Sequence, residues 1–74
     1  MAAASEEATV TVNGVARSLR CASLSELVRQ VGHDPDRPGI AVAVNGEVIP
    51  RALWPLHSLE PGDEVEIVGA VQGG

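Results

Sequence analysis

The chain has 74 residues and a formal net charge of −5 at pH 7. A chain this short buries only about 60% of its unfolded surface, so we expect one domain of marginal stability. The acidic balance argues against binding to nucleic acid or to anionic membranes, which attract basic surfaces. It favours docking on a basic patch of a partner protein. Because Trp54 is the only aromatic residue, we expect Val, Leu, Ile and Ala to fill the core.

Several classes of protein are excluded. No apolar run approaches the ~20 residues of a membrane-spanning helix, and residues 1–8 lack the segments of a signal peptide, so we expect a cytoplasmic protein. Cys21, His33 and His57 are too few and too scattered for a zinc or iron–sulfur site. We interpret Cys21, the only cysteine, as a small buried side chain. No nucleophile–base pair is recognisable, so we do not expect an enzyme.

The first third of the chain predicts a hairpin. Residues 1–8 show no alternation and are predicted to be a disordered lead-in. Polar and apolar residues alternate over 9–12, which predicts a half-buried strand. Asn13-Gly14 is the preferred pair for a two-residue type I′ turn, and a return strand should follow from Val15 to about Arg20.

One short helix is predicted next. Four apolar residues recur at the spacing of a single helical face: Leu24, Leu27, Val28 and Val31. Ser23 and Glu26 have the spacing of a capping box, and Gly32 stands where a left-handed C-terminal cap is expected. A helix of about two turns is unstable alone, so it should pack on a sheet.

Two strands and a turn follow the loop over 33–39. The apolar run over 40–44 predicts a central strand, because both of its faces are apolar. A second turn pair, Asn45-Gly46, leads into a short strand over 47–49, which Pro50 should confine to the sheet edge.

The remaining segments predict an irregular crossing and a last strand. Pro55 excludes a full helix over 51–59, where we expect a turn or a short 3₁₀ stretch with Leu53, Trp54 and Leu56 capping one end of the core. The alternation over 64–68 then predicts a strand.

This order of elements predicts an α+β domain with the β-grasp, or ubiquitin-like, fold. It should contain a mixed sheet of four to five strands with one short helix packed on it. We assign the domain to residues 9–69 and a flexible C-terminal tail to residues 70–74. Fully extended, such a tail reaches at most ~16–18 Å, which is enough to carry a carboxylate into the active site of a partner. Gly73 and Gly74 have no Cβ and suit a narrow channel.

The segment from Ala41 to Gly74 resembles the bacterial sulfur carriers, and among them the ThiS family of thiamine biosynthesis. The matching features are the A-V-N-G-E turn, the V-I-P-R-x-x-W segment that ends at Trp54, His57, and the P-G-D-E-V-E-I entry to the last strand. The resemblance covers about residues 9–74. The lead-in is longer than is usual in that family, and Gln72 stands where a small residue is more common.

The resemblance implies a mechanism. A ThiF-like enzyme would adenylate the Gly74 carboxylate with ATP, and sulfur from a cysteine desulfurase or another persulfide donor would convert it to a thiocarboxylate. A ThiG-like thiazole synthase would take that sulfur for the thiazole ring of thiamine. The carrier itself would bind no cofactor. Gly73, Gln72 and Val71 would thread the partner's active site.

Three acidic residues are candidates for docking on these enzymes: Asp63, Glu64 and Glu66. They are equally consistent with a solvated strand face.

Other functions also fit the sequence. A MoaD-like carrier for molybdopterin and a carrier for cysteine or tRNA thiolation share the same chemistry. A ubiquitin-like modifier would join Gly74 to lysines of target proteins, and a plain β-grasp interaction module would not use the tail. The chain has five Arg and no Lys, so its body offers no side-chain amine to attack an activated carboxyl group.

Overall fold

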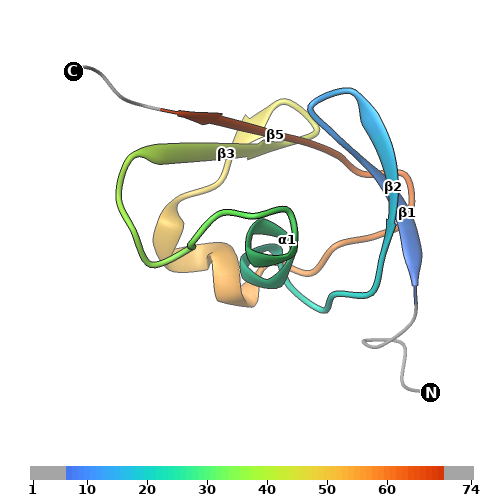
Figure 1. Cartoon of the computed structure of the whole chain (residues 1–74), viewed down its shortest axis with the longest axis horizontal. Helices are drawn as coiled ribbons and strands as arrows, with labels where there is room; N and C mark the ends of the chain where they lie inside the picture. Colours follow the sequence, from blue (N-terminus) through green and yellow to red (C-terminus); the bar gives the residue numbers. More distant parts are fainter. Residues whose placement is uncertain (1–6, 70–74) are drawn as a thin grey trace.

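The computed structural model describes residues 7–69 (Figure 1). Most of the predicted lead-in and all of the predicted tail lie outside these residues. The elements in chain order are β1 (Ala8–Val12), β2 (Val15–Leu19), α1 (Leu24–Gln30), β3 (Ile40–Val44), β4 (Glu47–Val48), the 3₁₀ helix η2 (Arg51–Leu56) and β5 (Glu64–Gly69). Each agrees with a predicted element to within one or two residues, apart from the exact extent of the 3₁₀ helix, which the sequence left open.

The five strands form one mixed sheet in the order β2-β1-β5-β3-β4. The β1–β2 and β3–β4 pairs are antiparallel hairpins. β5 lies between them, parallel to β1 and antiparallel to β3. Figure 1 shows the sheet bending over α1, with η2 beside the helix. This is the predicted β-grasp arrangement, with β4 at one edge and β3 inside the sheet as the sequence indicated.

Both hairpins turn on an Asn-Gly pair. Asn13 and Gly14 have φ values of 53° and 83°, and Asn45 and Gly46 have values of 53° and 85°. Positive φ at both central residues is the condition for a type I′ turn, whose twist matches that of the flanking strands. The two turns predicted from the sequence are therefore confirmed.

The N-terminal cap of α1 is a shifted form of the predicted capping box. Ser23 Oγ accepts a hydrogen bond from the Glu26 N–H at 3.3 Å, as expected. The Glu26 carboxylate, however, accepts from the N–H of Ala22 at 2.8 Å rather than from that of Ser23. Two free donors are still satisfied, so the cap has the same stabilising effect.

The C-terminal end of α1 requires a glycine. Gly32 has a φ of 102°, and a Cβ at this position would meet nothing within 4 Å, so the backbone conformation alone selects the residue. The N–H groups of Gly32 and His33 donate to the carbonyls of Arg29 and Val28 at 3.1 and 3.0 Å. These two bonds are those of a Schellman motif, as the sequence indicated.

The core lies between α1 and the inner face of the sheet. Its buried side chains are Val10, Val12, Leu24, Leu27, Val28, Val42, Val44, Ile49, Trp54, Val65 and Ile67. Trp54 is the largest of the fully buried side chains, and its indole Nε1 donates to the Ile49 carbonyl at 2.8 Å. A buried indole N–H needs such a partner, because desolvation without one is costly.

The prediction that Leu53 and Leu56 cap the core is wrong. Their side chains are 47% and 76% exposed, whereas Trp54 is 2% exposed. A 3₁₀ helix has three residues per turn, so residues i and i+3 share a face. Arg51 and Trp54 share the face of η2 that is turned towards the core. Leu53 and Leu56 share a different face, which therefore points outward.

We expect Leu27→Ala to lower the free energy of unfolding by about 2–5 kcal/mol, because a fully buried leucine leaves a cavity when it is truncated. Leu56→Ala is the matched control and should change it by less than about 0.5 kcal/mol. Urea denaturation followed by Trp54 fluorescence measures both. Equal losses would contradict the burial of Leu27 and the exposure of Leu56.

Candidate functional site

The strand that leads into the predicted tail is held on both sides. On one side β5 pairs with β3 along its whole length, from Val65 opposite Val44 to Gly69 opposite Ile40. On the other side β5 pairs with β1 only at its start, where Val12 lies opposite Val65. Figure 1 shows β5 running away from the β1–β2 hairpin and ending beside β3. The last described residues therefore belong to the most central strand of the sheet.

The asparagine side chains of both turns bind β5. Asn13 Oδ1 accepts from the Ile67 N–H at 2.8 Å, and Asn13 Nδ2 donates to the Ile67 carbonyl at 3.1 Å. Asn45 Oδ1 accepts from the Glu64 N–H at 2.9 Å, near the start of the strand. Sequence reasoning assigned these residues to the turns alone. The signal that could have indicated these bonds is that each Asn-Gly pair follows a strand, β1 or β3, that neighbours β5 in the sheet.

The sequence-predicted site residues are only partly described. Gly74, Gly73, Gln72 and Val71 lie outside the described residues. Of the three candidate docking residues, Asp63 is committed to the turn before β5, because its Oδ1 accepts from Asn45 Nδ2 at 3.0 Å and its Oδ2 accepts from the Glu60 N–H at 2.9 Å.

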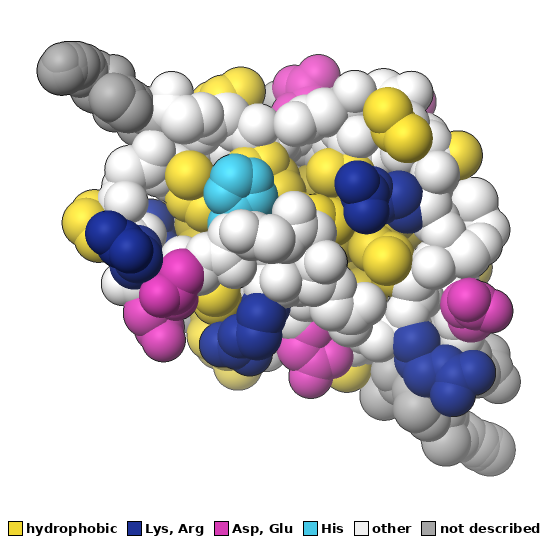
Figure 2. Space-filling model, viewed as in Figure 1, with side chains coloured by type: hydrophobic (Ala, Val, Ile, Leu, Met, Phe, Trp, Pro, Cys, Tyr) yellow, Lys and Arg dark blue, Asp and Glu magenta, His cyan; other side chains and the backbone are white. Residues whose placement is uncertain are grey.

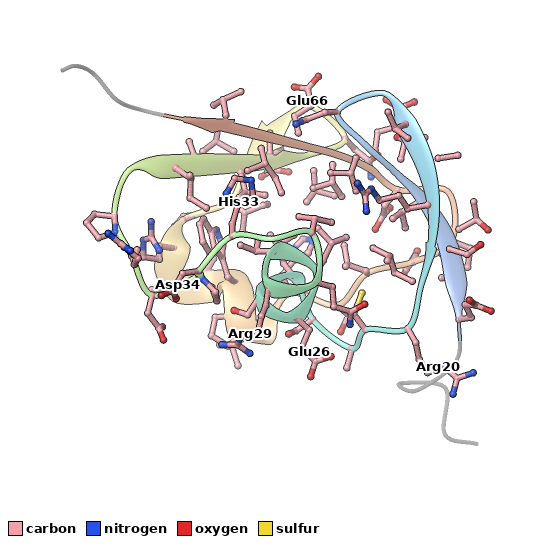
Figure 3. All side chains as sticks on the ribbon, in the orientation of Figure 1. Arg20, Glu26, Arg29, His33, Asp34 and Glu66 are labelled. Atoms are coloured by element: carbon pink, nitrogen blue, oxygen red, sulfur yellow. The ribbon has the colours of Figure 1, made fainter. Side chains whose placement is uncertain are left out.

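Glu64 and Glu66 have exposed side chains on β5. Successive residues of a strand point to opposite faces, and Val65 and Ile67 are buried, so both carboxylates lie on the face of the sheet that is turned away from α1. Figure 3 shows Glu66 directed away from the helix. The structure thus brings two of the three predicted acidic residues together on one open face.

A shallow apolar depression lies beside Glu66 on this face. We call it the outer-face patch and define it by the outward residues of three adjacent strands: Ala41, Ala43, Val48, Glu66 and Val68. The volume of the depression is about 180 Å³. Val48 and Val68 are 67% and 56% exposed. An exposed apolar surface with a polar rim is typical of a protein–protein contact.

The residues that carry the P-R-x-x-W pattern have structural roles. The Arg51 guanidinium lies 4.5 Å from the centre of the Trp54 ring, a cation–π distance. Arg51 also donates to the carbonyl of Pro35 and so ties η2 to the loop after α1. The backbone N–H of Leu24 donates to the carbonyl of His57 at 3.0 Å, which joins the start of the helix to the end of η2.

A second depression lies between the end of α1 and the start of β3. Its volume is about 370 Å³, and its lining includes His33, Asp34 and Arg37. Figure 2 shows the face of the molecule that is seen in Figure 1, where acidic and basic side chains are interspersed and no single sign of charge dominates. Within residues 7–69, no three His, Cys, Asp or Glu side chains are close enough to hold a metal ion.

Cys21 is partly buried and packs against the edge of the core. Burial, and secondly the negative charge of Glu26, raise the pKa of the Cys21 thiol above its ordinary value. The thiolate is the reactive form of cysteine, so this thiol is a weak nucleophile at neutral pH. The interpretation of Cys21 as a small packing residue agrees with its position, although its burial is only partial.

In the part of the chain that the structure covers, no helix combines the length and the apolar character needed to cross a membrane. This finding accords with the sequence, in which no sufficiently long apolar run occurs.

Comparisons with known proteins agree with the fold and the motifs. The profile of the ThiS family matches residues 10–74. The sulfur carrier protein ThiS of Escherichia coli (strain K12) is 30% identical over 61 residues, which cover 78% of this chain and 89% of that protein. The crystal structure of the thiamine biosynthesis protein ThiS from Geobacter metallireducens superposes with a TM-score of 0.73 at 28% identity, covering 89% of this chain and 99% of the other. The chain belongs to the ThiS family.

Proposed function

We propose that the protein is a sulfur carrier of thiamine biosynthesis whose Gly74 carboxylate is converted to a thiocarboxylate. The observation that carries this proposal is the family match, which runs from β1 through Gly74. The relatives are a sulfur carrier protein and a thiamine biosynthesis protein. A third support is the position of β5, since the strand that leads to residue 70 is the one that both hairpins hold.

The chemistry needs an activating partner. A carboxylate becomes a useful electrophile when its oxygen attacks the α-phosphorus of ATP and pyrophosphate leaves, which a ThiF-like enzyme catalyses in our proposal. The persulfide sulfur of a desulfurase then attacks the acyl adenylate and displaces AMP. A second thiol cleaves the resulting acyl disulfide and leaves the thiocarboxylate on Gly74. A ThiG-like thiazole synthase receives that sulfur.

The outer-face patch is the docking surface in this proposal. Its apolar part supplies area that an enzyme can cover, and Glu66 at its rim with Glu64 nearby supplies negative charge. Opposite charge on the partner speeds encounter and fixes orientation. The chain's charge of −5 has the sign that suits a basic partner surface. Asp63 contributes less directly, because its carboxylate holds the turn that starts β5.

The absence of lysine suits this chemistry. An acyl adenylate reacts with amines, and the chain contains no Lys. The activated terminus therefore meets no side-chain amine on its own body. The partly buried Cys21, with its raised thiol pKa, is a poor competitor for the same electrophile.

We expect deletion of Gly74 to abolish sulfur loading and to leave the fold unchanged, because every strand and helix that the structure describes lies within residues 8–69. The measurement is intact-mass analysis after incubation with a ThiF-like enzyme, ATP and a persulfide donor. Cys21→Ala is the control and should load like the parent protein.

Loading that persists without Gly74 but disappears with Cys21→Ala would show that sulfur is carried on the thiol. Transfer of the whole chain to lysines would establish a protein modifier, and sulfur delivery to molybdopterin but not to thiazole would establish the MoaD-like alternative.

Glu66→Arg should raise the KM of the activating enzyme for the carrier about tenfold, because it replaces the negative charge at the rim of the proposed contact with a positive one. Glu47→Arg is the matched control, since Glu47 is an exposed strand residue that pairs with the inward-facing Val44 and so lies off the outer face. ATP–pyrophosphate exchange at varied carrier concentration measures both variants. Equal changes of KM for the two substitutions would show that the outer-face patch is not part of the docking surface.

A further inference from the structure

The two sides of β5 are supported unequally beyond Val65. Towards β3 the ladder continues to Gly69. Towards β1 the backbone ladder stops, because β1 turns back at Asn13-Gly14 immediately after Val12. Without a further contact, residues 66–69 would be held by β3 alone.

The carboxamide of Asn13 supplies that further contact. The backbone N–H of Asn13 donates to the Val65 carbonyl at 2.9 Å, which is the last backbone bond of the β1 side. Its side chain then bonds both the N–H and the carbonyl of Ile67, at 2.8 and 3.1 Å. A carboxamide has the donor and acceptor of a peptide group, so Asn13 acts as one additional rung of the ladder. Both bonds are partly buried and join residues 54 positions apart in the chain.

The turn alone does not require this side chain. A type I′ turn needs positive φ at its first central residue, and glycine meets that condition as well as asparagine does. Asn45 occupies the same position in the other turn with the same φ of 53°. Its carboxamide, however, bonds Glu64 and Asp63, at the opposite end of β5 from Gly69. The protein therefore contains two asparagines at equivalent turn positions: Asn45 supports the start of β5, and Asn13 supports Ile67, two residues before its end.

We propose that Asn13 is a positioning residue that fixes the point from which residues 70–74 are presented to the activating enzyme. This inference rests on the proposed function. Asn13 contacts no reacting atom and acts through Ile67. When the Asn13 carboxamide is in place, only residues 68 and 69 are held by β3 alone. Without it, β3 alone would hold residues 66–69. A longer, more loosely held segment must be ordered each time the terminal carboxylate enters an active site.

The effect should appear in kcat rather than in KM. The outer-face patch does not include Asn13, so docking is preserved when the carboxamide is removed. In the docked complex of such a variant, however, the Gly74 carboxylate occupies the reactive position for a smaller fraction of the time than in the parent protein. This signature differs from that of Glu66→Arg, which acts on docking.

The test compares Asn13→Gly with Asn45→Gly in the full chain. We expect Asn13→Gly to speed hydrogen exchange of the Ile67 amide about tenfold, as for the loss of one or two hydrogen bonds, and to lower the kcat of ATP–pyrophosphate exchange several-fold at unchanged KM. Asn45→Gly should leave both quantities as in the parent protein. The free energy of unfolding of each variant, measured by urea denaturation with Trp54 fluorescence, corrects for any global loss of stability.

Two results would overturn the inference: an unchanged kcat for Asn13→Gly, or an equal fall in kcat for Asn45→Gly. If Asn13→Gly does not fold, Asn13→Asp decides the question by the same criteria. Aspartate tolerates the turn and keeps the acceptor for the Ile67 N–H, but it places an oxygen opposite the Ile67 carbonyl. The parent protein tests the proposed function separately, because absence of any ATP–pyrophosphate exchange with it would contradict the carrier function and not the role of Asn13.

Discussion

The fold depends on the insertion of β5 between two hairpins that otherwise do not meet in the sheet. The β1–β2 and β3–β4 hairpins are each closed by a local turn, but only β5 joins them, parallel to one and antiparallel to the other. Isolated two-stranded hairpins are marginal in water. The inward residues of β5, Val65 and Ile67, also complete the core beneath α1. One strand therefore closes the sheet, fills the core and leads into the segment on which the proposed chemistry depends.

The core contains one aromatic side chain, and its other buried residues are aliphatic. Trp54 is the single bulky side chain, and three contacts fix its surroundings: its own bond to Ile49, the stacked Arg51, and the link from Arg51 to the loop at Pro35. Arg51 and Trp54 of the P-R-x-x-W segment thus anchor the irregular crossing between β4 and β5. The outer face of the sheet, by contrast, is built from small residues and leaves an open apolar surface.

Local features were predictable from the sequence, and long-range ones were not. The Asn-Gly turns, the stripe of α1 and the glycine cap follow from the conformations of neighbouring residues, and all three are confirmed. Leu53 and Leu56 were placed wrongly because hydrophobicity alone does not say which face of a 3₁₀ turn is covered. The bonds from Asn13 to Ile67 join positions that no periodicity relates. Of the candidate site, the sequence predicted the outward acidic residues of β5, but it could not show that the Asp63 carboxylate is already bonded to Asn45 and Glu60.

The central place of β5 also bears on when the protein can fold. The ribosome makes β5 after the other four strands, so both hairpins emerge before the strand that joins them exists outside the exit tunnel. The domain therefore cannot complete its sheet during synthesis of its first sixty residues and must fold late, in one cooperative step. A nascent chain in this state exposes the inner faces of two unjoined hairpins, so aggregation competes with folding until β5 has emerged and joined them.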